Sequence, residues 1–215
     1  MEKFWMISLD LLEGFGTTCL IFFATLIFAL PLGLLFAFFT ISRYKILRTI
    51  MKTFIWIIRG TPLMLQLLVV YYGPALVFGW EFLDRIVAVL VAFSLNYACY
   101  FSEIYRSGIE GVSQGQFEAG QVLGMTKTQI FFKVILMQAI KRVIPPMSNE
   151  IITLVKDTSL ARIIVVEEIL KVAYNYAAKG LIWPLFYTAI YYLIFIGVLT
   201  VLLSALEKKF DWFKI

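Results

Sequence analysis

The chain has 215 residues, of which 61% are hydrophobic and only 15% charged, and its formal net charge is +5. Soluble domains are typically about 45–50% apolar and about 25% charged, so this composition indicates a bilayer protein rather than a soluble or nucleic-acid-binding domain. The absence of histidine excludes histidine-dependent catalysis, and Cys19 and Cys99 lie in apolar runs that suggest neither a disulfide nor a metal site. We therefore expect no metal and no cofactor.

The first three predicted elements are apolar stretches long enough to cross a bilayer, which takes roughly 20 residues of helix. Residues 17–39 contain no charged residue and form the first predicted span. The second covers residues 53–78, with Arg59 near its start, and the third covers residues 86–105. We expect the Arg59 side chain to extend toward the membrane surface, as arginines near the ends of spans commonly do.

Residues 130–166 mix apolar runs with charged residues, and the last apolar stretch is residues 183–206. Pro145 and Pro146 lack the N–H group that a helix interior needs, so we expect no continuous helix through them. We predict an interfacial helix that ends at about Val143 and a polar fourth span that begins at about Pro146. The fold class is then an all-α membrane protein with about five transmembrane helices.

Lysine and arginine are divided unevenly between the two sets of loops that five spans create. The richer set holds twelve, which are Arg43, Lys45, Arg48, Lys52, Arg59, Lys127, Lys133, Lys141, Arg142, Lys208, Lys209 and Lys214. The poorer set holds five, which are Lys3, Arg85, Arg162, Lys171 and Lys179. Basic residues concentrate in cytoplasmic loops, so we predict that the N-terminus is outside and the C-terminus inside. The polar segment 112–130 is then cytoplasmic, and we expect residues 1–215 to form a single domain.

Two stripes of polar residues lie in the predicted third and fourth spans, where ionisable groups are costly and usually functional. They are Asn96, Tyr100 and Glu103 in one, and Glu150, Thr153 and Asp157 in the other. Spacings of three and four residues put the members of each stripe on one helix face. The stripes would bind a substrate if they faced each other across a cavity. An alternative stays open, in which they only join helices and Glu103 pairs with Arg106 and Asp157 with Lys156.

Four segments carry a resemblance to a known family. Residues 118–137 match the pattern E-A-A-x3-G-x9-I-x-L-P, with Gly120, Val134 and Met137 in place of its third Ala, its Ile and its Pro. The other three are IIRGTPLMLQ at 57–66, YFSEIYRSGIEGVSQGQ at 100–116 and PPMSNEIITLVKDTSLA at 145–161. Together they resemble the permease subunits of polar amino acid ABC importers, which have the methionine-importer-type fold. The resemblance extends from about residue 14 to the C-terminus.

The resemblance implies a multi-pass permease that moves a polar L-amino acid, basic ones included, across the cytoplasmic membrane of a prokaryote. It implies three protein partners in that bilayer system: a dimeric ABC ATPase, an extracytoplasmic amino-acid-binding protein, and a second permease subunit that is identical or homologous. ATP hydrolysis would reside in the ATPase, so this chain would not be an enzyme. The alternative is an ATP-independent transporter or channel subunit, which explains the spans but not the E-A-A-like loop.

The resemblance also gives segment 112–130 a role as a short coupling helix seated in a cleft of the ATPase. The residues that it implies in coupling are Phe117, Glu118, Ala119, Gly120, Leu123 and Gly124. Apolar side chains of this segment would fill a groove on the partner, while Glu118 would meet the polar rim of that groove.

Overall fold

The computed structural model describes residues 2–210, and the regular elements in that range are all helices. The long helices are α1 (Glu2–Ile41), α4 (Arg85–Glu110), α7 (Leu136–Asp157) and α9 (Trp183–Phe210). The short ones are α2 (Lys45–Arg59), α3 (Leu63–Phe78), α5 (Gln114–Val122), α6 (Lys127–Ile130) and α8 (Ile169–Ala177). A π-helical turn, Phe131–Ile135, leads into α7, and a 3-10 segment, Thr158–Ile164, follows it. The predicted all-α class is confirmed.

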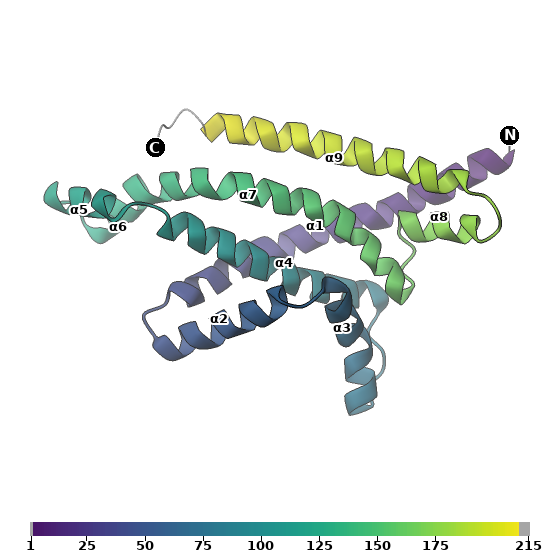
Figure 1. The fold of residues 1–215 in the computed structure, drawn as a ribbon, viewed down its shortest axis with the longest axis horizontal. Coiled ribbons are helices and arrows are strands. Elements are labelled where there is room, and N and C mark those ends of the chain that lie inside the picture. Colours follow the sequence, from purple (N-terminus) through teal and green to yellow (C-terminus); the bar gives the residue numbers. More distant parts are fainter. Residues whose placement is uncertain (1, 211–215) are drawn as a thin grey trace.

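The four long helices run along the long axis of the molecule, and α1 packs along α4 (Figure 1). α5 and α6 lie at one end of this axis, and α8 lies at the other end beside the N-terminal part of α1 (Figure 1). α3 projects away from the long helices (Figure 1). Segment 112–130, which is expected to dock on a partner, therefore connects α4 to α7, the two helices that carry the polar stripes.

Three of the described helices, α1, α4 and α9, are long and apolar enough to cross a membrane. α2 and α3 reach that length only as a pair, and they are bent by 104° at the break between them, as in a broken span or a re-entrant segment. α7 is outside this set because it carries five charged residues, which are Lys141, Arg142, Glu150, Lys156 and Asp157. The count of about five spans and the outside N-terminus stay predictions.

The second predicted span is wrong as a single helix, because the chain breaks between Arg59 and Leu63. Pro62 has φ −63° and ψ 136°, an extended conformation, and it precedes the first residue of α3. A proline also disfavours helical backbone in the residue before it, here Thr61, so α2 ends and a new helix starts in another direction. The sequence contained this signal in Gly60-Thr61-Pro62.

The predicted end of a helix at Val143 is also wrong, because α7 continues through Pro145 and Pro146. The two prolines leave the carbonyl groups of Lys141 and Arg142 without their usual donors. One cleft is lined by Lys141 and Pro145 and another by Arg142 and Pro146, so both sides of this turn are open. Helices in membranes tolerate proline where water or neighbouring groups satisfy the freed carbonyl groups, so the helix can continue.

Close packing of α1 on α4 depends on Gly33. A Cβ atom added at this glycine would lie 2.8 Å from Cβ of Phe101 and 2.9 Å from the carbonyl oxygen of Ala98. Phe101 and Ala98 are both fully buried, so neither has room to retreat. They occupy the face of α4 that is opposite its polar stripe. The glycine therefore sets how closely the two helices approach.

α1 begins at Glu2, well before residue 17, because its N-terminal part packs on α8. There the Asp10 carboxylate accepts a hydrogen bond from the Tyr176 hydroxyl. At the start of α8, the fully buried Glu168 accepts hydrogen bonds from the backbone N–H groups of Leu170 at 2.8 Å and Lys171 at 2.7 Å. Burial raises the pKa of Glu168 to about 7 even though these hydrogen bonds oppose the change.

Replacing Gly33 with alanine should destabilise the protein by about 1–3 kcal/mol, because the added methyl group overlaps α4. The matched control is Gly197→Ala in α9, where nothing lies within 4 Å of an added Cβ. The control should be neutral or stabilising by roughly 0.5–1 kcal/mol, since alanine favours helix. Thermal unfolding in detergent measures both changes. Equal unfolding midpoints for the two variants would contradict this account of the packing.

Glu168 should make stability depend on pH. Its pKa is raised in the folded state, so its contribution is fully present below its ordinary pKa of 4.5 and is lost as pH rises through about 7. In Glu168→Gln this loss should disappear. The unfolding midpoints of wild type and Glu168→Gln are compared from pH 4.5 to 8. As pH rises over this range, the midpoint of the variant should increase relative to that of wild type. A difference that is constant over this range would refute the assignment.

Candidate functional site

The polar stripes of α4 and α7 face a common cavity of about 450 Å³, here called the acid cavity. Its walls are the α2–α3 break at residues 61–64, α4, α7 and the start of the 3-10 segment. Its lining includes five of the six predicted substrate residues, which are Asn96, Tyr100, Glu150, Thr153 and Asp157. The predicted juxtaposition of the two stripes is thus present in the structure. The role of these residues in binding stays a prediction.

A second cavity of about 640 Å³, here called the arginine cavity, adjoins the first and shares Tyr100 and Glu150 with it. Its lining includes three arginines, Arg59, Arg106 and Arg142, and it extends along α4 to Gly111, just before the coupling segment. The charged residues that line the acid cavity are carboxylates only, whereas the arginine cavity is lined by guanidinium groups and by the carboxylates of Glu103 and Glu150.

Glu103, the sixth predicted substrate residue, lies outside the acid cavity and is already paired. Its carboxylate accepts hydrogen bonds from Nη2 of Arg106 at 2.6 Å and Nε at 3.2 Å, and Nη1 of Arg59 lies 3.7 Å away. Arg106 also pairs with Glu110 at 2.5 Å. The pairing of Glu103 with Arg106 that the alternative predicted is therefore present. Two guanidinium groups neutralise this carboxylate, so it has little attraction left for a cation.

The Arg59 side chain is 41% exposed and also contacts α4, while its extension toward the membrane surface stays a prediction. Its guanidinium carbon lies 5.0 Å from the centre of the Tyr100 ring, in a cation–π contact, and its Nη1 approaches Glu103. Arg59 is the last residue of α2, so the break after it directs the side chain toward α4.

The two carboxylates of α7 have no cation partner within the described residues. Asp157 accepts a hydrogen bond from the Tyr97 hydroxyl at 2.7 Å, and no ion pair in residues 2–210 joins it to Lys156. Glu150 is in no ion pair in that range either. The two lie seven residues apart on one helix, which separates them by about 10 Å along its axis. The acid cavity thus offers two acceptor groups to a positively charged ligand.

Two residues of the site were missed by the sequence analysis, Tyr97 and Gln66. Tyr97 lies beside the predicted stripe and orients Asp157. Gln66 is a lone amide in the apolar helix α3, and its Oε1 accepts a hydrogen bond from Nδ2 of Asn96 at 3.0 Å. An isolated polar residue in a membrane helix usually bonds to another helix, so Gln66 could have been found from its surroundings in the sequence.

The predicted coupling segment forms two short helices that present apolar residues outward. Val122 is 88% exposed and Leu123 78% exposed at the end of α5. Gly124 follows with φ +74°, which turns the chain toward α6. Gly120 is buried against Ile130, and a Cβ added there would lie 2.7 Å from Cγ1 of Ile130. The glycine at the third position of the E-A-A-like pattern is therefore a packing requirement of this chain.

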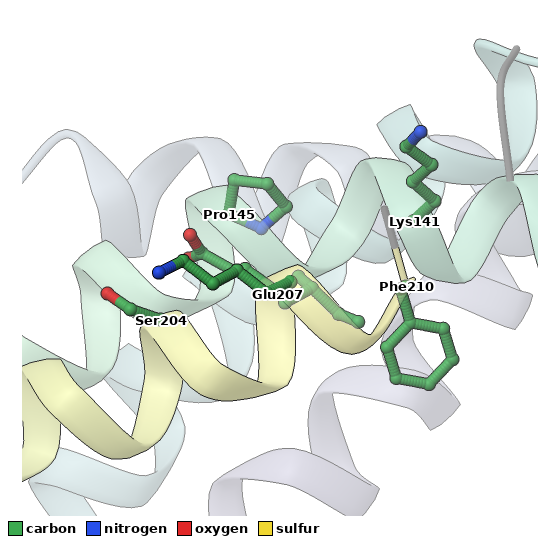
Figure 2. Close-up of a pocket in the computed structure, with 7 residues that line it drawn as sticks. Lys141, Pro145, Ser204, Glu207 and Phe210 are labelled. Atoms are coloured by element: carbon green, nitrogen blue, oxygen red, sulfur yellow. The ribbon is translucent and has the colours of Figure 1, made fainter. Parts of the chain in front are cut away.

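One further cleft of about 340 Å³ lies between α7 and α9, away from both stripes. Figure 2 shows Lys141 and Pro145 of α7 and Ser204, Glu207 and Phe210 of α9 along it. Its lining contains neither predicted substrate residues nor predicted coupling residues.

Comparison with known proteins identifies relatives over nearly the whole chain. The family model described as "Binding-protein-dependent transport system inner membrane component" matches residues 29–212. The L-cystine transport system permease protein TcyB of Bacillus subtilis (strain 168) is 37% identical over 98% of this chain and 89% of its own length. The arginine transport system permease protein ArtQ of the same organism is 34% identical over 93% and 91%. A putative glutamine transport system permease protein GlnP of Rickettsia felis is 32% identical over 96% and 95%.

Solved structures show the same fold. A crystal structure of an amino acid ABC transporter with histidines contains a chain that is 29% identical, with a TM-score of 0.88 and coverage of 96% of this chain and 97% of that chain. A chain of the MetNI methionine ABC transporter in an inward-facing conformation has a TM-score of 0.72 at 18% identity, with 98% of each chain covered. The expected methionine-importer-type fold is confirmed.

Proposed function

The chain belongs to the family of binding-protein-dependent transport system inner membrane components, and from this premise we propose how its cavities serve transport. It is a multi-pass permease subunit of an ABC importer for amino acids, located in the bacterial inner membrane. Import in this family is driven by ATP hydrolysis in a separate subunit. The family does not include the ATP-independent transporters or channels that the sequence left as an alternative, so that alternative is set aside.

We propose that the acid cavity binds the ammonium group of a polar amino acid during its passage. Glu150 and Asp157 support this role because both line the cavity and neither has a cation partner in the described chain. Charged groups at membrane depth are retained mainly where they serve a pathway. A basic side chain would give the substrate a second cation for the second carboxylate. Cystine, with two ammonium groups, would meet the same pair of carboxylates.

Glu103 takes a different part in this proposal. Because Arg106 and Arg59 already neutralise it, Glu103 serves to hold the break after α2 beside α4. Tyr100 and Thr153 complete the cavity wall near the ammonium group. The arginine cavity then receives the substrate on the side toward the coupling segment, where Arg142, which is in no ion pair within the described residues, attracts the carboxylate of an amino acid.

We further propose the expected assembly: a single permease domain over residues 1–215, five spans with the N-terminus outside, and three kinds of protein partner. A second permease subunit, an ATPase dimer and an extracytoplasmic amino-acid-binding protein are those partners. The exposed Val122 and Leu123 support docking of α5 on the ATPase, because apolar side chains on a polar segment favour a protein partner. ATP hydrolysis belongs to that partner rather than to this chain.

Uptake by the complete complex in proteoliposomes, with labelled arginine, glutamine and cystine, tests the function. Wild type should take up at least one of them in an ATP-dependent manner; uptake of none would refute the assignment. Glu150→Gln and Asp157→Asn should each raise KM for that amino acid about tenfold, the value of one charge-assisted hydrogen bond. Glu103→Gln is the matched control. It should lower the unfolding midpoint and leave KM within about twofold. A higher KM in Glu103→Gln alone would contradict the division of roles.

The turn at Gly124 should be needed for coupling. A valine at φ +74° is strongly disfavoured, so Gly124→Val should change the angle between α5 and α6. We expect uptake to fall at least tenfold, on the order of a lost interface contact, while the ATPase still binds ATP. Gly115→Val, in the same segment but without positive φ, is the control and should retain most uptake. Normal uptake by Gly124→Val would show that this turn does not transmit ATPase motion.

A further inference from the structure

Gln66 connects the two walls of the acid cavity through hydrogen bonds at both ends of its amide. Its Nε2 lies 2.7 Å from the carbonyl oxygen of Ile58, 3.1 Å from that of Thr61 and 2.8 Å from Oγ1 of Thr61, and its two hydrogens are shared among these three acceptors. Its Oε1 accepts from Nδ2 of Asn96 at 3.0 Å. One side chain on α3 therefore holds the break that follows α2 and, at the same time, the polar stripe of α4.

The break itself fixes which way the Gln66 amide faces. The carbonyl groups of Ile58 and Thr61 can only accept, so they require the NH2 side of the amide. Pro62, four residues after Ile58, has no N–H to supply to the Ile58 carbonyl, and Gln66 supplies a donor there. The Thr61 hydroxyl donates to the Ile57 carbonyl at 3.0 Å, which leaves its oxygen to accept from Gln66.

The orientation of Gln66 in turn fixes that of Asn96. Since Oε1 of Gln66 can only accept, Asn96 presents its NH2 group to α3 and its Oδ1 to the other side. Asn96 lines the acid cavity, and within residues 2–210 its Oδ1 has no hydrogen-bond donor. Asn96 is only 5% exposed, so the groups packed around it, Gln66 among them, set which way its amide faces.

We propose that Gln66 is a positioning residue that orients the Asn96 amide so that Oδ1 accepts a hydrogen bond from the ammonium group of the amino acid. The inference rests on the proposed function. It adds Gln66 as the residue that sets the orientation of the uncharged Asn96 amide in the site. Glu150 and Asp157 on α7 then supply charge, and Asn96 on α4 supplies a neutral acceptor opposite them. Without Gln66, the Asn96 amide turns over and offers its NH2 group to a cation, which repels it.

The test uses the complete complex in proteoliposomes with saturating binding protein and whichever of arginine, glutamine and cystine wild type takes up. Gln66→Met keeps the length of the side chain and removes both hydrogen-bonding groups, and Asn96→Leu removes the acceptor itself. Each should raise KM about tenfold with Vmax within about twofold of wild type. The double variant should be no worse than Asn96→Leu alone, because Gln66 acts through Asn96.

The control is Gln138→Met, which removes another buried amide, on α7 about 18 Å along the helix from Glu150. It should leave KM as in wild type. Three outcomes would overturn the inference: an unchanged KM in Gln66→Met, a fall in Vmax and unfolding midpoint without a change in KM, or multiplied effects in the double variant. If wild type takes up none of the three amino acids, the proposed function itself fails. If wild type takes up one of them and KM is unchanged in Gln66→Met, only the inference about Gln66 fails.

Discussion

The missing N–H group of Pro62 is the constraint on which the site depends. It ends the helix that began at Lys45 and leaves the Ile58 carbonyl without its helical donor, and the new helix leaves at 104° to the old one. The break makes one wall of the acid cavity. It also directs Arg59 onto Tyr100 and gives Gln66 the acceptors that fix its amide. A straight helix through residues 59–63 would offer none of these groups to α4.

The charges of the site are arranged so that some are satisfied by the fold and others are left for a ligand. Glu103 is held by two arginines and belongs to the fold. Asp157 accepts one hydrogen bond from the neutral hydroxyl of Tyr97 and is in no ion pair within the described residues. A carboxylate that is oriented by a neutral donor remains attractive to a cation, whereas one paired with guanidinium does not. The described structure therefore has a carboxylate with two guanidinium partners on α4 and two carboxylates in no ion pair on α7.

Sequence periodicity predicted the two stripes because helical spacing depends only on local geometry, and α4 and α7 keep that geometry over the residues concerned. Local spacing also gave the pair of Glu103 with Arg106, but not the approach of Arg59 to Glu103 or of Tyr97 to Asp157, because these depend on which helices meet. The break at Pro62 was readable from Gly60-Thr61-Pro62, but the hydropathy of residues 53–78 concealed it. The opposite error occurred at Pro145 and Pro146, where open clefts beside the helix remove the cost that usually stops it. The roles of Gln66 and of Gly120 required neighbours distant in sequence.

The contact between Gly120 and Ile130 has a consequence for how the coupling segment can change. The space beside Gly120 is occupied by the Ile130 side chain, so the volume available to the two positions is shared. Alanine at position 120 would therefore require the Ile130 side chain to move or α5 to shift away from α6. Because the exposed Val122 and Leu123 follow directly, such a shift would tilt the apolar surface that the segment presents.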